Sequence, residues 1–326
     1  MGRIRAAVVG AGYFGKYHAE KYSRLDDAEL VAVADNEIAR AVKLARAYKA
    51  EAVADYRELL GKVDAVSVVV PTPAHYEVAK AFLDCGTDVL LEKPMVEDLA
   101  QADELIALAE SRGGILQVGH LQRFSSAILQ LNGIISRPVF IECYRIAPFK
   151  PRGSEVNVIL DLMIHDIDLI QAIARSPVVQ VDAVGTPVLT GGADIANVRL
   201  HFASGCSANV TASRVSLKNE RKMRIFQPDA YFSIDFVQRK LAILRKGEGE
   251  MFPGVPRISR EERSFDAGDD LEREIKAFLQ SVNTRKPPPV SGVDGRRALE
   301  TAFLITESLR SHAARVASAS GGDQIA

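Results

Sequence analysis

The first third of the chain alternates short apolar runs with longer amphipathic segments. The apolar runs are four to eight residues long, which is typical of strands buried on both faces, and the segments between them repeat apolar residues with the helical period. The predicted strands span residues 4–10, 28–35, 64–71, 87–92 and 115–120, and the predicted helices span residues 13–25, 36–50, 74–86 and 99–114. Because crossovers between parallel strands are right-handed, this order predicts an α/β fold with a doubly wound parallel sheet over residues 1–120.

After residue 120 the apolar residues mostly alternate with polar ones, as they do in strands with one buried face. Strand-like runs span residues 138–147, 178–186, 193–202, 206–215, 221–229 and 230–237, and helical patterns span residues 125–136, 158–174, 269–283 and 294–316. No helix of crossover length separates the last five strands, which favours antiparallel pairing. We therefore predict an α+β domain with a largely antiparallel open sheet over residues 121–316, with a loop at 246–257 and a disordered tail over 317–326.

The bulk composition excludes several classes of protein. The net charge is -1, with 41 Lys+Arg against 42 Asp+Glu, so no overall field attracts nucleic acid or an anionic membrane. The 3 cysteines form no CxxC pair, and no cysteine and histidine cluster has the spacing of metal ligands, so we expect no metal. The opening MGRIR leaves no room for a signal peptide before the first strand, and no apolar run is long enough to span a bilayer. The expectation is a cytoplasmic protein with a small-molecule substrate.

A glycine-rich turn joins the first predicted strand to the first predicted helix. It reads Gly10-Ala11-Gly12-Tyr13-Phe14-Gly15. Such a motif is a weak signal alone, but between a strand and a helix it predicts a dinucleotide site. Gly10 would permit the tight turn, Gly12 the close approach of a pyrophosphate, and Gly15 close helix packing, while the N–H groups at the start of the helix, near Tyr13 and Phe14, would face the phosphates.

An acidic residue ends the second predicted strand. Asp35 lies twenty residues after Gly15 and is followed by Asn36, without an adjacent arginine. A carboxylate here can accept hydrogen bonds from the adenosine ribose and repels a 2′-phosphate, which predicts NAD rather than NADP. The alternative is that Asp35 is an ordinary helix N-cap.

Polar residues follow the run of valines that ends near residue 70. Thr72 and Pro73 would lie at the carboxyl edge of the sheet, where such folds bind ligands. His75 opens the next helix, either close to the nicotinamide or exposed to water as an ordinary surface histidine.

A charged pair ends the next predicted strand. Glu92 and Lys93 precede Pro94, which stiffens the backbone at the edge expected to hold the nicotinamide. We assign both charged residues to the cofactor edge. The Lys93 ammonium could also stabilise a substrate oxygen as it loses a proton. The simpler alternative is an ion pair between Glu92 and Lys93 at a surface turn.

A second constellation lies in the helical pattern of residues 158–174. Asp161 and His165 are four residues apart and share a face if the helix is regular. Histidine is the natural general base for a hydroxyl proton near neutral pH, and Asp161 could orient the ring, raise its basicity or hold a neighbouring hydroxyl. Isolated His and Asp residues on an apolar helix are more often satisfied core groups, and Asp166 and Asp168 are interpreted as caps or packing partners.

These motifs together resemble the Gfo/Idh/MocA oxidoreductases. The resemblance rests on VVGAGYFGKYHAE, on VVVPTPAHYEVAKAFLDCGTDVLLEKPM and on LDLMIHDIDLI, and with the domain order it extends over nearly the whole chain. It implies that Lys93 and His165 act on a sugar or polyol hydroxyl with Asp161 in the same pocket. It also implies an NAD-binding (Rossmann) domain and an open sheet whose outer face makes a homodimer or homotetramer. Apolar residues at alternating strand positions agree with a sheet face that needs cover.

One departure from the family pattern narrows the expected substrate. The approach to the histidine helix reads YRIAPFKPRGSEVN rather than glycine-rich, and together with GHLQRF it resembles the branch that acts on UDP-N-acetylglucosamine. Arg145, Lys150 and Arg152 would bring positive charge to a diphosphate, although each alone could be an ordinary solvated residue. The alternatives are a dehydrogenase of a free sugar or an inositol-type polyol, or a non-catalytic NAD-binding regulator.

Overall fold

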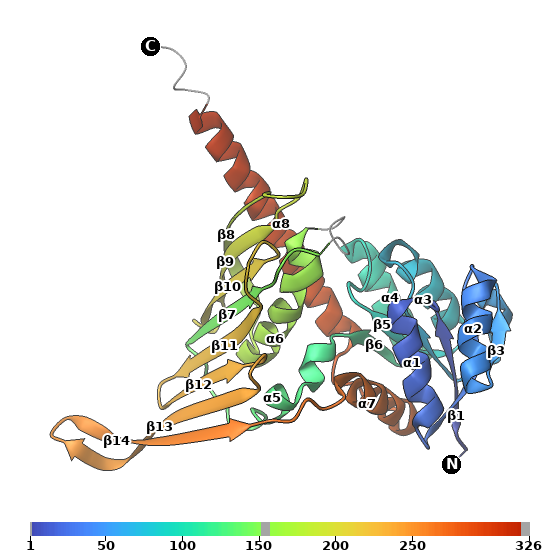
Figure 1. Ribbon diagram of the computed structural model, residues 1–326, viewed down its shortest axis with the longest axis horizontal. Coiled ribbons are helices and arrows are strands. Elements are labelled where there is room, and N and C mark those ends of the chain that lie inside the picture. Colours follow the sequence, from blue (N-terminus) through green and yellow to red (C-terminus); the bar gives the residue numbers. More distant parts are fainter. Residues whose placement is uncertain (1, 151–156, 321–326) are drawn as a thin grey trace. The chain divides into compact units, whose positions relative to one another are not determined.

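The computed structural model describes residues 2–150 and 157–320, and the chain divides into two compact units (Figure 1). Unit 1 comprises Met1–Phe124 and Asp269–Arg297, and unit 2 comprises Ser125–Gly268 and Ala298–Ala326. Each unit has its own sheet and its own hydrophobic core.

Unit 1 contains a six-stranded parallel sheet with the order β3-β2-β1-β4-β5-β6. The strands are β1 (Ile4–Val9), β2 (Ala28–Ala34), β3 (Glu51–Val53), β4 (Ala65–Val68), β5 (Asp88–Glu92) and β6 (Leu116–Gly119). The helices are α1 (Tyr13–Arg24), α2 (Ile38–Tyr48), α3 (His75–Asp84), α4 (Leu99–Arg112) and α7 (Asp270–Thr284), with short 3-10 turns η1 (Tyr56–Leu59), η2 (Thr72–Ala74) and η3 (Leu121–Phe124). The predicted doubly wound sheet is confirmed, and its strand order reverses between β1 and β4, which is where such sheets bind ligands.

Helix α7 belongs to unit 1, although it follows the strands of unit 2 in sequence. Ile275, Phe278 and Leu279 are buried in the core of unit 1, and Lys21 on α1 pairs with Asp269 at 2.5 Å. The sequence prediction placed this helix in the second domain and the boundary at residue 120. An amphipathic stripe predicts burial but does not say which core covers it, so the return of α7 could not be read from periodicity.

Unit 2 contains an eight-stranded sheet with the order β14-β13-β12-β11-β7-β10-β9-β8. The strands are β7 (Phe140–Ile146), β8 (Val178–Thr186), β9 (Ile195–Phe202), β10 (Ser207–Ser213), β11 (Glu220–Gln227), β12 (Ala230–Asp235), β13 (Lys240–Phe252) and β14 (Val255–Ser264). The helical elements are α5 (Ser126–Leu129), a π-turn η4 (Ile159–Met163), α6 (Ile164–Ala174) and α8 (Gly292–Ser320), whose first residues lie in unit 1. All neighbouring strands are antiparallel except β7 and β10, so the predicted largely antiparallel sheet is confirmed.

Three local predictions in this half of the chain differ from the structure. The predicted loop at 246–257 is the paired end of the β13–β14 hairpin, which continues beyond the last pairing of β12 at Arg245 (Figure 1). The predicted helix at 125–136 is only the single turn α5, and Gly133 then takes a positive φ. Helix α8 extends to Ser320, so residues 317–320 of the predicted tail are helical.

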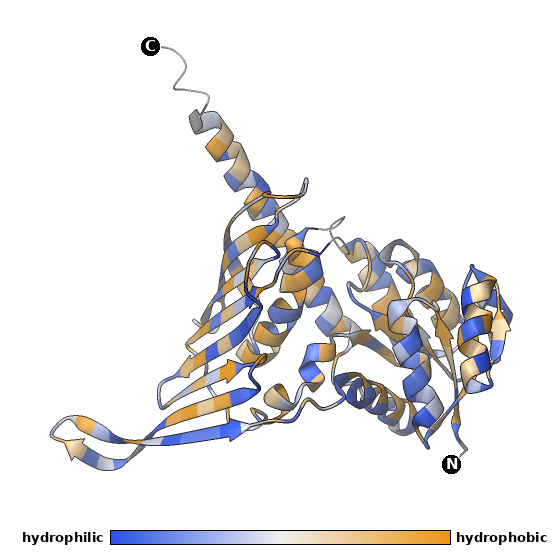
Figure 2. Ribbon diagram, in the orientation of Figure 1, coloured by the Kyte–Doolittle hydropathy of each residue, from blue (hydrophilic) through white to orange (hydrophobic). Residues whose placement is uncertain are grey.

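The two faces of the unit 2 sheet differ in polarity. Alternate residues such as Val198, Leu200, Phe232 and Ile234 are fully buried in the core with α6 and the later part of α8, and the colour alternates along the strands in Figure 2. Residues on the opposite face are largely polar, with an ion pair between Glu142 and Arg224, beside a smaller aromatic group of Phe140, Phe226 and Tyr231. The apolar side chains at alternating positions are therefore buried within unit 2, and they do not by themselves require a second copy of the chain.

Within the described ranges, no helix is both long enough and apolar enough to cross a membrane.

Candidate active site

The glycine turn of unit 1 has the geometry that a dinucleotide site requires. Gly10 has φ +104°, and a Cβ atom there would lie 2.5 Å from the carbonyl oxygen of Val69. A Cβ atom at Gly15 would lie 1.7 Å from the carbonyl oxygen of Gly10, whereas at Gly12 it would meet nothing within 4 Å. Gly10 and Gly15 thus serve conformation and packing, while Gly12 faces open space at the start of α1.

Helix α1 presents its N-terminal end beside this open space. Its N-cap residue Gly12 has no side chain to cap the first N–H groups, and the first turn contains no acid. The Tyr13 and Phe14 side chains are exposed, and their rings meet edge to face at 5.5 Å. A helix N-terminus of this kind favours an anionic ligand such as a pyrophosphate.

Asp35 connects the glycine turn to the start of α2. One carboxylate oxygen accepts the Ala11 N–H at 2.7 Å and the other accepts the Glu37 N–H at 2.9 Å, while Asn36 is exposed. The N-cap of α2 is Glu37 and not Asp35, so the alternative of an ordinary helix N-cap is wrong. Because a carboxylate has about four acceptor positions, both oxygens retain capacity for ribose hydroxyls.

The segment after β4 contains Thr72 and Pro73 in η2 and then His75 at the start of α3. Thr72 is half-buried and Pro73 is exposed, whereas His75 is only 1% exposed. Its Nδ1 lies 2.9 Å from the carbonyl oxygen of Pro94 and its Nε2 lies 2.9 Å from that of Val70. Burial lowers the pKa of His75 despite these contacts. The alternative of a solvent-exposed histidine is wrong, and both ring nitrogens face backbone carbonyls.

Lys93 is half-buried directly after β5, and Glu92 beside it turns toward the interior. Glu92 accepts the Lys93 backbone N–H at 3.2 Å, and its other carboxylate oxygen lies 3.3 Å from Nε2 of His18. Burial alone would raise the pKa of Glu92, but the His18 hydrogen bond and the charge of Lys93 outweigh burial and lower it. The alternative of a Glu92–Lys93 ion pair at a surface turn is thus wrong for Glu92, whose carboxylate is directed into unit 1 and hydrogen-bonds the first N–H of the turn.

His18 continues the hydrogen-bond network of Glu92 into the core of unit 1. Its Nδ1 lies 3.1 Å from the Ser67 hydroxyl on β4, which lies 2.9 Å from the Tyr22 hydroxyl on α1. A single direction satisfies every atom, with Tyr22 donating to Ser67, Ser67 to His18, and His18 to Glu92. The sequence prediction missed this network, because one histidine on a helix carries no signal of a partner seventy residues away.

In unit 2, Asp161 and His165 lie on the helical segment that begins after Asn157. Both are half-buried, whereas Asp166 and Asp168 are buried. The first part of the segment is the π-turn η4, in which Ile164 N–H bonds to the Ile159 carbonyl. The predicted four-residue stacking on a regular helix is therefore altered, since a π-turn is wider, and such turns are frequent at functional sites.

Arg145 on β7 forms a buried ion pair with Asp166. Its Nε and Nη2 donate to the two carboxylate oxygens at 2.6 Å each, and the two side chains are 11% and 1% exposed. The expectation of Arg145 as a cation at the pocket edge is corrected, because Arg145 is buried and Asp166 occupies the Nε–Nη2 edge of its guanidinium. Lys150 is exposed, and Arg152 lies outside the described residues.

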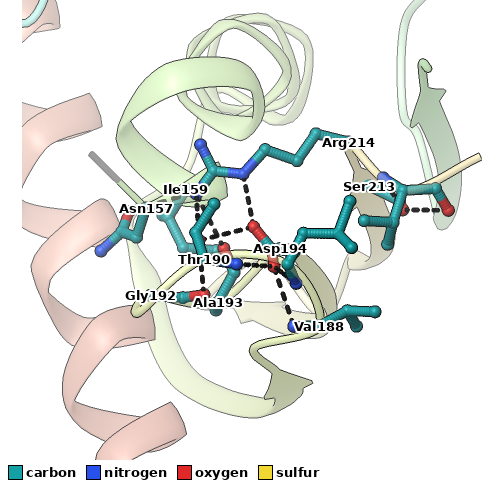
Figure 3. A network of polar contacts seen from close by, with 11 residues as sticks. Asn157, Ile159, Val188, Thr190, Gly192, Ala193, Asp194, Ser213 and Arg214 are labelled. Atoms are coloured by element: carbon teal, nitrogen blue, oxygen red, sulfur yellow. Dashed lines mark hydrogen bonds and ion pairs between the residues drawn. The ribbon is translucent and has the colours of Figure 1, made fainter. Parts of the chain in front are cut away.

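The start of this helical segment is tied to a loop built around Asp194 (Figure 3). The Asp194 carboxylate is fully buried and accepts hydrogen bonds from the backbone of Val188, Leu189 and Thr190, from the Thr190 hydroxyl, and from Arg214 Nε at 2.8 Å. Burial alone would raise the pKa of Asp194, but these hydrogen bonds override it and hold the pKa far below its usual value.

This loop meets the helical segment at its first residues. The Ala193 carbonyl accepts the Val158 N–H at 3.0 Å, and the Asn157 side chain caps the N–H groups of Ile159 and Leu160 at 3.1 Å. The loop therefore fixes the point from which Asp161 and His165 project. Sequence periodicity gave no signal for it, because Asp194 reads there as an ordinary strand residue.

The candidate residues thus fall into two groups, one in each unit. Unit 1 gathers the glycine turn, Asp35, Thr72 and Lys93 at the carboxyl ends of neighbouring strands, and unit 2 carries Asp161 and His165 on one helical segment. Within residues 2–150 and 157–320, no group of three His, Cys, Asp or Glu side chains could hold a metal ion.

Comparison with protein families gives two matches along the chain. Residues 4–120 match a model described as an oxidoreductase family with an NAD-binding Rossmann fold, and residues 135–232 match the GFO/IDH/MocA C-terminal domain. The two matches follow the two sheets described above.

Among characterised proteins, the chain is 38% identical over 306 residues to UDP-N-acetylglucosamine 3-dehydrogenase of Acidithiobacillus ferrooxidans, covering 94% of this chain and 97% of that protein. It is 29% identical to myo-inositol 2-dehydrogenase of Thermotoga maritima, covering 94% and 96%. A crystal structure of the Acidithiobacillus enzyme superimposes with a TM-score of 0.89 at 37% identity, over 95% of this chain and 99% of that one.

Proposed function

The chain belongs to the Gfo/Idh/MocA family of dehydrogenases that act on CH–OH groups, and from this premise we propose that it oxidises UDP-N-acetylglucosamine, or a close nucleotide sugar, with NAD. The oxidised group is the C3 hydroxyl of the sugar, and the product is a 3-keto sugar. The observation that carries the proposal is the 38% identity to a UDP-N-acetylglucosamine 3-dehydrogenase along 94% of the chain.

The residues of unit 1 fit a dinucleotide. Gly12 leaves open space at the N-terminal end of α1, where a larger side chain would intrude, and Asp35 retains acceptor capacity beside it. We propose NAD rather than NADP, because the Asp35 carboxylate would repel a 2′-phosphate. When bound, NAD supplies the acceptor for the hydride.

In the proposed reaction, the two groups of candidate residues act on one secondary hydroxyl. His165 removes the hydroxyl proton while the C–H bond of the same carbon releases a hydride, so the alcohol loses two hydrogens and becomes a ketone. The Lys93 ammonium donates a hydrogen bond to the oxygen as negative charge develops on it. Asp161, four residues before His165, orients the imidazole or holds a neighbouring hydroxyl of the sugar.

The diphosphate contacts are revised from the sequence prediction. Since Arg145 is paired with Asp166, we propose Lys150 and Arg152 as the cations that approach the diphosphate. Arg145 instead holds the helix that carries His165.

A second candidate is a free inositol or sugar. The observation that favours it is the 29% identity to myo-inositol 2-dehydrogenase over the same 94% of the chain. Both candidates use the same hydride chemistry, so they differ only in the substrate.

A substrate panel separates the two candidates. The purified protein with NAD is tested by NADH absorbance against UDP-N-acetylglucosamine, UDP-glucose, N-acetylglucosamine, myo-inositol and scyllo-inositol. We expect the highest kcat/KM with UDP-N-acetylglucosamine. Faster turnover of an inositol or a free sugar would replace the proposed substrate by the second candidate.

We also propose a homodimer or homotetramer in solution, on the strength of the family resemblance and of the aromatic group of Phe140, Phe226 and Tyr231 on the outer sheet face. Light scattering at micromolar concentration tests it, and a monomeric mass would contradict it.

A further inference from the structure

We propose that His75 is a positioning residue that holds the Lys93 turn against the end of β4. The proposal rests on the proposed function only in the role that it gives to Lys93. His75 is not a catalytic residue here, because its contacts are to backbone carbonyls and not to reacting atoms.

The hydrogen-bonded ladder between β4 and β5 ends before the turn. The last registered pair joins Val68 to Leu91, so Val70 and Lys93 both lie beyond it. The His75 imidazole lies between the two segments, with Nε2 2.9 Å from the Val70 carbonyl and Nδ1 2.9 Å from the Pro94 carbonyl. The ring therefore continues the link between the strands at the point where the ladder no longer does.

This link also reaches the glycine turn. The backbone at Gly10 packs so closely on Val69 that a Cβ atom would lie 2.5 Å from the Val69 carbonyl oxygen. Val69 also donates its N–H to the Val9 carbonyl at 2.8 Å. The end of β4 is thus fixed to the dinucleotide turn on one side and, through His75, to Pro94 on the other.

The chemistry of the side chain explains why histidine stands at this position. The rigid ring places a nitrogen atom 2.9 Å from each of two carbonyl oxygens, and its N–H donates to one of them in the neutral form and to both in the protonated form, whereas a phenyl ring donates to neither. His75 is 1% exposed, so water does not replace a lost contact readily. Loss of the ring nitrogens would remove the contact at the Pro94 carbonyl, while Glu92 would still accept the Lys93 backbone N–H.

The test uses His75→Phe and His75→Asn, with Val78→Ala as the matched control. Val78 is 4% exposed on the same helix and its side chain forms no hydrogen bonds, so its truncation loosens the packing of α3 without removing a hydrogen bond to the Lys93 turn. Hydrogen–deuterium exchange of the segment 92–98 needs no substrate and reports on the turn itself. We expect faster exchange there in His75→Phe, a smaller change in His75→Asn, whose shorter side chain keeps an N–H donor group, and none in Val78→Ala.

Activity on the best substrate of the panel gives the second readout. We expect kcat to fall by ~10²-fold in His75→Phe, the size of effect expected for a catalytic group displaced by about 1 Å, with the KM for NAD nearly unchanged. Equal kcat losses in His75→Phe and Val78→Ala would overturn the positioning role.

The two readouts separate this inference from the proposed function. If the wild-type protein oxidises no substrate of the panel, the proposed function fails, and exchange of the segment 92–98 still decides whether His75 holds the turn. Unchanged exchange in His75→Phe would overturn the inference even if the enzyme is active. Should His75→Phe fail to fold, His75→Asn supports the inference if it exchanges faster at 92–98 than Val78→Ala, and contradicts it otherwise.

Discussion

Replacing Arg145 by alanine should destabilise unit 2 rather than merely weaken substrate binding. The substitution removes two 2.6 Å charge-assisted hydrogen bonds and leaves the Asp166 carboxylate, 1% exposed, without its bidentate partner. Breaking a buried ion pair by removing one partner typically costs ~3–5 kcal/mol. Since domains are stable by only ~5–15 kcal/mol, the loss is a large fraction of the total.

Urea unfolding followed by far-ultraviolet circular dichroism measures this change. The chain has no tryptophan, so fluorescence of that residue is no substitute. With an m-value of ~2 kcal/mol/M, the transition of unit 2 should move down by ~1.5–2.5 M urea. A transition of unit 1 can be identified because only that unit should be stabilised by added NAD.

Two comparison variants distinguish the loss of the buried ion pair from the loss of a positive charge. Lys150→Ala removes an exposed cation from the same segment and should leave the midpoint unchanged. A paired replacement, Arg145→Met with Asp166→Leu, leaves no buried charge and should recover most of the lost stability. An unchanged midpoint in Arg145→Ala, with a raised KM for the nucleotide sugar alone, would refute the structural role of Arg145. It would instead support the interpretation of Arg145 as a cation at the edge of the substrate pocket.

Three further predictions concern the candidate site residues and the loop around Asp194. His165→Asn and Lys93→Met should each leave a folded, NAD-binding protein whose kcat is lower by ~10²–10⁴-fold, and a near-normal rate in steady-state assays would exclude the assigned roles. Asp35→Ser should reduce the preference for NAD over NADP in binding titrations, whereas tighter binding of NADP by the wild-type protein would contradict the cofactor assignment. Because the pKa of Asp194 is lowered by folding, its stabilisation is complete above the unfolded value of ~3.9 and is lost as pH falls below it. The urea midpoint of unit 2 should therefore fall steeply below pH ~4 in the wild type and less steeply in Asp194→Asn. The control Asp182→Asn replaces an exposed carboxylate and should behave like the wild type. Parallel curves for all three proteins would disprove the role of Asp194.

The sequence predicted those features that depend on neighbours along the chain. The buried strands of unit 1 and the glycine turn carry their own local signals, because a continuous apolar run, a positive φ at Gly10 and a close approach at Gly15 each demand particular residue types. The β13–β14 hairpin was missed because its local sequence carries no strand signal. Its glycine, proline and charged residues resemble a loop, and only the pairing with the opposite strand makes it a sheet.

Features that depend on distant partners could not be predicted. The sequence predicted Arg145 as a cation at the pocket edge, but Asp166 pairs with it in the interior, and the sequence left open an exposed His75, which in fact lies between the Val70 and Pro94 carbonyls. The choice between a buried and an exposed state for each of these side chains depends on tertiary packing that one sequence does not reveal. The sequence named Lys93 and His165 as candidates but not the residues that contact their segments.

Transfer of deuterium is the most direct test of the central claim that hydride moves from the sugar C3 to the nicotinamide. UDP-N-acetylglucosamine carrying deuterium at C3 is incubated with the protein and NAD, and the reduced cofactor is analysed by mass spectrometry. The account predicts that the deuterium appears in the reduced cofactor, that a 3-keto sugar forms, and that both vanish in His165→Asn. Reduced cofactor without deuterium, or none from this substrate while an inositol is oxidised, would contradict it.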